Sequence, residues 1–230
     1  MLLTQVLQIT IDSAAQALAE QPTEEKLSII ELLLKGGWIL IPLFVMSIIA
    51  IYIFVERYLT IKRASKEEKN FMTQIREYVL QGNIDAAKTL CKGSDNPIAR
   101  MIEKGLSRVG RPLKDINVAI ENTGKIEIFK LENNLAGLAT ISGAAPMIGF
   151  FGTVIGMIKA FFNMSKAGNN IEVGLLAGGI YEAMITTAAG LVVGIIAFIG
   201  YNILVTMIEK VIYKMETSSL EFVDLLQDPA

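Results

Sequence analysis

Three long stretches of the chain carry almost no charged side chains, and each is long enough to cross a membrane. They cover about residues 36–56, 135–164 and 173–208. A bilayer with a hydrocarbon core of about 30 Å requires a helix of about 20 predominantly apolar residues. The second and third stretches exceed that length, so we expect both helices to be long and to extend into the cytoplasm. The pattern predicts an all-α integral membrane protein with three transmembrane helices.

The segment between the first two spans, residues 57–134, is too charged for a membrane and is patterned as helices. Turn-forming residues around Gly82 and Gly93 divide its first half into short amphipathic helices. After Pro112 apolar residues recur at helical spacing without a stop signal, so we expect one long helix that continues into the second span. The short helices are expected at about residues 71–80, 84–91 and 97–109.

The charges on the two sides of the first span predict its direction. Arg57, Lys62 and Arg63 follow the span, whereas the segment before it is net acidic. Basic residues stay on the cytoplasmic side, so we expect an inner-membrane protein with a periplasmic N-terminus and a cytoplasmic C-terminus. The predicted parts are N-terminal interfacial helices at 1–35, the first span at 36–56, a cytoplasmic helical region at 57–134, the second span at 135–164, a periplasmic link at 165–172, the third span at 173–208 and a cytoplasmic tail at 209–230.

The composition argues against several classes of function. The chain has 230 residues and a net charge of −2, which gives no electrostatic case for binding nucleic acid. It contains no histidine and a single cysteine, Cys91, which excludes a His-based metal site, a catalytic triad with histidine and a disulfide framework. The sequence has no Walker motif and no glycine-rich dinucleotide fingerprint. We therefore expect neither a metal nor a cofactor.

Glu182 is an acidic residue in the interior of the third span. It lies nine residues beyond Val173, about 14 Å along a helix and near the bilayer centre. An acidic side chain there costs about 2.5–3.5 kcal/mol on insertion scales, and such residues are functional by default. We interpret Glu182 as the ionisable element of a proton pathway with no compensating basic residue. The alternative is a protonated Glu182 that only hydrogen-bonds a neighbouring helix; Lys159, near the outer end of the second span, is a weak candidate partner.

Three threonines lie at a depth similar to that of Glu182. Thr186 and Thr187 follow it by four and five positions, and Thr153 lies on the second span ten residues before Asn163. We expect these hydroxyls to line a polar path, the alternative for each being a hydrogen bond to its own helix, which is equally favoured for Thr186. Small residues also recur at helical spacing on both spans, which predicts close helix packing. They are Gly149, Gly152, Gly156, Gly179, Gly190 and Gly194.

Several of these motifs together resemble the MotA/TolQ/ExbB proton channel family over about residues 30–215. They are the runs Ala145–Met157 and Gly179–Leu191, Gly36-Gly37-Trp38, Glu56-Arg57 and Tyr201-Asn202. The resemblance places the family's glutamate on Glu182, its second-span threonine on Thr153 and its third-span threonine on Thr187. Thr186 is often alanine in relatives.

The resemblance also implies the function. It implies a homopentamer in the bacterial inner membrane around the transmembrane helices of a single-span ExbD- or TolR-like partner. Such a proton-channel subunit passes proton-motive force to a TonB- or TolA-like protein, for outer-membrane transport or envelope integrity. Chain length and the modest cytoplasmic insertion resemble ExbB or TolQ more than the flagellar MotA.

Three alternatives to this function stay open. They are a non-conducting structural scaffold of a membrane complex, a cation channel that works without a partner, and a flagellar stator of the MotA type. An enzyme is not expected, because no second catalytic group accompanies Glu182 inside the membrane.

Overall fold

The computed structural model describes residues 37–66, 70–167 and 173–227, all within one unit of the chain, Gly36–Ala230. The N-terminal helices predicted at 1–35 lie outside the described residues, and so does most of the link predicted at 165–172. The described residues form helices and contain no strand, which confirms the all-α class. The helices are α3 (Leu40–Ala64), α4 (Phe71–Leu80), α5 (Ile84–Gly93), α6 (Pro97–Leu106), α7 (Leu113–Glu132), α8 (Leu135–Ala167) and α9 (Val173–Gln227).

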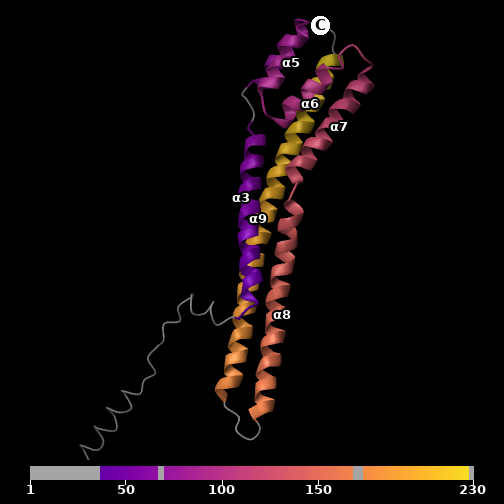
Figure 1. The fold of residues 1–230 in the computed structure, drawn as a ribbon. Helices are drawn as coiled ribbons and strands as arrows, with labels where there is room; N and C mark the ends of the chain where they lie inside the picture. The colour runs from indigo at the N-terminus through magenta and orange to yellow at the C-terminus, as the bar shows by residue number, and fades with distance from the viewer. Residues whose placement is uncertain (1–36, 67–69, 168–172, 228–230) are drawn as a thin grey trace, which may run out of the picture. The chain divides into compact units, whose positions relative to one another are not determined.

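Three long apolar helices, α3, α8 and α9, run side by side (Figure 1). The segments Leu40–Ala64, Leu113–Lys166 and Leu176–Gln227 are long and apolar enough to cross a membrane, which confirms the three predicted spans. Consecutive helices α8 and α9 run in opposite directions and make the most extensive contact of the described part, while α3 packs against both of them. Glu182, the acid predicted in the third span, thus lies on a helix that contacts both of the other spans.

The α8–α9 interface brings two helix backbones into direct contact. A Cβ added at Gly190 would lie 2.6 Å from the carbonyl oxygen of Ala145, and one at Gly156 would lie 3.0 Å from that of Gly179. Only small residues permit so close an approach. Gly149, Gly179 and Gly194 also meet the backbone of the opposite helix, whereas Gly152 lies against the Thr186 side chain.

Helices α4, α6 and α7 pack against α9, and α5 packs against α4 and α6; the apolar core among them is continuous with the one between the spans. Phe222, Ile102 and Ile120 are fully buried there. Helix α6 begins at a proline, and the Asn96 side chain accepts a hydrogen bond of 3.0 Å from the backbone N–H of Ile98, which caps the helix. Helix α9 continues beyond the predicted span, through this core, to Gln227.

The expected single helix leading into the second span is wrong, because the chain breaks between α7 and α8. Asn133 has an extended ψ of 140° and Asn134 has a left-handed φ of 64°, a conformation that asparagine tolerates better than most residues. The buried Arg57 of α3 donates a hydrogen bond of 3.1 Å to the carbonyl oxygen of Lys130. A carbonyl of the last turn of α7, which lacks a helical partner, is thereby satisfied.

Candidate functional site

Glu182 of α9 forms an ion pair with Lys159 of α8. The distance between Lys159 Nζ and Glu182 Oε1 is 3.0 Å, and the two side chains are 47% and 20% exposed respectively. The neighbouring contact between Gly156 and Ala183 sets the register of the two helices and places positions 159 and 182 opposite each other. The expectation that no basic residue compensates Glu182 is therefore wrong.

Besides α8 and α9, the turn that precedes α3 also borders the site. Gly37 has a left-handed φ of 71°, and a Cβ added there would overlap Glu182 Oε1 and lie 3.1 Å from Glu182 Cδ. Glu182 therefore lies level with the beginning of α3, while α8 and α9 continue beyond that level (Figure 1). Helices α3, α8 and α9 each contribute one element: a backbone turn, an ammonium group and a carboxylate.

None of the three candidate threonines forms a hydrogen bond with Glu182 in the described part of the chain. Thr186 is fully buried and donates to the Ala183 carbonyl oxygen at 2.8 Å. Thr153 likewise donates to its own helix, to the Phe150 carbonyl oxygen at 2.6 Å. Thr187 instead donates across the helix pair, in the bond described next.

Thr187 ties α9 to α8 on the flank of the interface opposite to the ion pair. Its hydroxyl donates to the Gly149 carbonyl oxygen at 3.1 Å. With 3.6 residues per turn, successive positions are rotated by about 100°. On this count Thr153 and Thr187 fall on one flank of the α8–α9 contact, and Lys159 and Glu182 fall on the flank that faces α3. One chain thus holds Glu182 on one side of the helix pair and two of the three candidate hydroxyls, those of Thr153 and Thr187, on the other.

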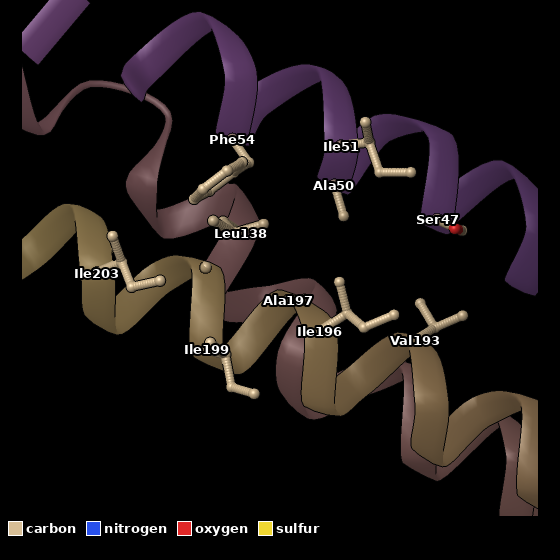
Figure 2. A pocket seen from close by; sticks show the side chains of 11 residues that line it. Ser47, Ala50, Ile51, Phe54, Leu138, Val193, Ile196, Ala197, Ile199 and Ile203 are labelled. Carbon is tan, nitrogen blue, oxygen red and sulfur yellow. The ribbon is translucent and has the colours of Figure 1, made fainter. Parts of the chain in front are cut away.

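One cavity beside the spans contains none of the candidate residues. It lies between α3, α8 and α9, has a volume of about 300 Å³, and is apolar apart from the Ser47 hydroxyl. Figure 2 shows Phe54 of α3, Leu138 of α8 and Val193 of α9 around it. This cavity offers no row of polar groups along which a proton can be passed.

Comparison with known proteins identifies the family. The profile described as the MotA/TolQ/ExbB proton channel family matches residues 93–217. The chain belongs to the MotA/TolQ/ExbB family. The matched segment includes Lys159, Glu182 and all three threonines, but it excludes α3 and the Gly37 turn.

Individual members of the family are similar over longer stretches. A protein of Synechocystis named as biopolymer transport protein ExbB-like 1 is 30% identical over 76% of this chain and 69% of its own length. The biopolymer transport protein ExbB of Neisseria meningitidis is 28% identical, covering 74% of this chain and 84% of its own. The Tol-Pal system protein TolQ of Haemophilus influenzae is 33% identical over 59% of this chain and 50% of its own.

Lys159 was expected to be only a weak partner of Glu182, although the positions of the two residues along the chain favour their pairing. Lys159 lies eight residues before the end of α8, and Glu182 lies nine residues after the start of α9. In two antiparallel helices joined by a short link, positions equally far from the link lie at the same level. Counting residues outward from the link places Lys159 and Glu182 at nearly the same level.

Proposed function

We propose that this chain is the proton-channel subunit of a membrane motor, with Glu182 as the group that binds and releases the proton. One observation carries the proposal: an ionisable carboxylate lies on a helix that is apolar enough to span the membrane. Ionisable groups at such positions mark ion and proton pathways. Membership of a family described as proton channels agrees with this role.

The proposed motor contains several copies of the chain and at least one further protein. We infer a ring of five copies in the bacterial inner membrane around a single-span partner of the ExbD or TolR kind. The relatives named as biopolymer transport and Tol-Pal proteins support an output through a TonB- or TolA-like protein. Lys62 and Arg63, in the last turn of α3, support a cytoplasmic location for that end of the helix.

In this function the residues of the chain have distinct tasks. Glu182 alternates between carboxylate and carboxylic acid as a proton arrives and leaves. Thr153 and Thr187 offer hydroxyls on the other flank of the same helix pair. In a ring built from a head-to-tail interface, one flank of a copy faces the opposite flank of the next copy. The Thr153 and Thr187 hydroxyls of one copy would then lie beside the Glu182 carboxylate of the next copy and form one proton path with it.

The test is the activity of Glu182→Gln in a strain that depends on this chain for proton-driven envelope function. Glutamine retains the size and the hydrogen-bonding capacity of glutamate but cannot ionise. We expect activity to fall to the level of a strain without the gene, while the variant still assembles with its single-span partner. Glu209→Gln is the matched control, because Glu209 lies exposed on the same helix, and it should retain full activity.

Full activity of Glu182→Gln would contradict the proposal and leave the chain as a structural scaffold. Activity without the single-span partner, measured as proton uptake into vesicles, would identify a channel that works alone. Complementation of a flagellar motor mutant would point to a MotA-type stator.

A further inference from the structure

Lys159 is the charged group that faces Glu182 from the other described helices of the bundle. Between residues 135 and 208 the described charged residues are Lys159, Lys166 and Glu182. Lys166 lies two turns further along α8, where its Nζ is 4.4 Å from the centre of the Phe162 ring. The contact from α3 comes from the backbone turn at Gly37, which carries no side chain. The ammonium group of Lys159 therefore dominates the electrostatic surroundings of the carboxylate.

The two partners of the pair differ in how far they are enclosed. Glu182 is 20% exposed and is held between Lys159 and the Gly37 turn, whereas the Lys159 side chain is 47% exposed. A lysine has a flexible four-carbon stem and can extend its ammonium group toward water while its stem lies along apolar surface. Lys159 is consequently the partner that can leave, and Glu182 is the partner that stays.

An unpaired charge in a membrane is costly, so the pair is a low-energy resting state. A carboxylate paired with an ammonium group carries no net charge, and neither does a protonated carboxylic acid. A carboxylate without a cation or a proton is the state of Glu182 that has the highest free energy in the bilayer. A proton that binds Glu182 therefore removes the attraction for Lys159, and loss of that proton restores it.

We propose that Lys159 is the resting counter-ion of Glu182 and that an incoming proton displaces it from the carboxylate. This inference rests on the proposed function, since it assigns a regulating residue to the same site. The proton binds a carboxylate oxygen, the ammonium group keeps its own proton and moves toward solvent, and deprotonation of Glu182 recaptures Lys159. No bond other than the O–H bond of Glu182 forms or breaks.

The experiment replaces Lys159 and measures how activity depends on pH. The full-length chain is co-expressed with its single-span partner, purified as the complex and reconstituted into vesicles, and proton uptake is measured from pH 5 to pH 9. In Lys159→Met we expect the pH profile of proton uptake to differ from that of the natural chain, because no ammonium group then competes with the proton for the Glu182 carboxylate.

Three further variants separate the effect of charge from effects of packing and folding. Lys159→Arg keeps a cation at the position, so its pH profile should match that of the natural chain. Lys166→Met removes the other α8 lysine, which lies on the same side of the helix but does not pair with Glu182, and its profile should also be unchanged. Lys159→Gln is measured beside Lys159→Met, so that the test does not depend on the folding of one variant.

An unchanged pH profile in both Lys159→Met and Lys159→Gln, with normal assembly, would overturn the inference. A shift that appears equally in Lys159→Arg would also overturn it, because packing and not charge would then be responsible. Glu182→Gln in the same vesicles distinguishes the two proposals. If it conducts fully, the proposed function fails; if it does not conduct while the Lys159 profiles stay unchanged, only the role of Lys159 fails.

Discussion

Single residues around Glu182 act through position and shape as well as charge. Gly37 illustrates this, because its backbone adopts a φ of 71° and its missing side chain leaves the space that the Glu182 carboxylate occupies. Any other residue there meets two penalties, a left-handed backbone and a collision with the acid. A second glycine, Gly82, has the same φ of 71° but no atom within 4 Å of an added Cβ.

The comparison of Gly37→Ala with Gly82→Ala separates these two penalties. Both variants add left-handed backbone strain of about 1–3 kcal/mol. Only Gly37→Ala displaces the carboxylate, so we expect it to reduce proton-driven activity strongly while Gly82→Ala stays close to the natural chain. The measurement is activity normalised to the amount of assembled complex. Equal activity of the two variants would show that the Gly37 turn does not shape the site.

Pairs of helices set the distances on which the site depends. The ion pair and the Thr187 hydrogen bond both cross the α8–α9 interface, one on each flank. Their lengths follow from the close approach of the two backbones at Gly149 and Gly190. A change that separates the helices would lengthen both interactions together.

Gly190→Ala should separate these helices. The added Cβ would lie 2.6 Å from the Ala145 carbonyl oxygen and 2.8 Å from the Gly149 Cα. Overpacking of this kind costs about 1–3 kcal/mol, and we expect a lower midpoint of thermal unfolding in detergent together with reduced activity.

Gly143→Ala is the matched control on α8, since nothing lies within 4 Å of a Cβ at that position. Alanine in a helix interior is favoured over glycine by about 0.5–1 kcal/mol, so this variant should be as stable as the natural chain or more stable. An unfolding midpoint for Gly190→Ala equal to that of Gly143→Ala would contradict the close packing at residue 190.

One continuous helix joins the membrane part of the chain to the helices α4–α7. Helix α9 has 55 residues, and Phe222 near its far end is fully buried in the apolar core. Gly105 of α6 lies against this ring, at 2.7 Å between an added Cβ and Phe222 Cε1. Arg57 of α3 contacts the last turn of α7, beside the break between α7 and α8. Helix α9 therefore runs from the candidate site into the apolar core at its far end.

Cys91 reports on the integrity of that core. Burial, with a smaller contribution from the Glu103 carboxylate, raises the pKa of its thiol from 9.0 to about 12. The thiol of the folded chain should resist alkylation at neutral pH, because the reactive thiolate is scarce and enclosed. Between about pH 9 and 12 the thiol ionises in the unfolded chain first, so this titration lowers stability as pH rises through that window.

Phe222→Ala should expose Cys91 to alkylation. Loss of a buried phenylalanine costs about 3–5 kcal/mol, which increases the fraction of chains in which α4–α7 have separated from α9. Leu220→Ala is the control, because Leu220 is 66% exposed on the same helix and its loss should leave the labelling rate unchanged. The rate is followed by the mass shift after reaction with iodoacetamide. Slow labelling of Phe222→Ala, as in the natural chain, would contradict the shared core.

Features that depend only on the order of residues along the chain could be predicted before the fold was known. Three spans were predicted because three nearly uncharged stretches reach the length that a bilayer requires. Glu182 was recognisable because it is an acidic residue inside one of these stretches. The short helices around Gly82 and Pro97 were equally predictable, because turn and capping residues act on their immediate neighbours.

Features that depend on the rotation and register of packed helices became visible in the folded chain. The fold paired Lys159 with Glu182, set Thr153 and Thr187 on the other flank, and brought the Gly37 turn against the carboxylate. These contacts join residues from three helices, and a shift of one position rotates a side chain by about 100° around its helix. Counting residues from the link gives the level of Lys159 and Glu182 along their helices, but only the packed helices show that the two side chains face each other.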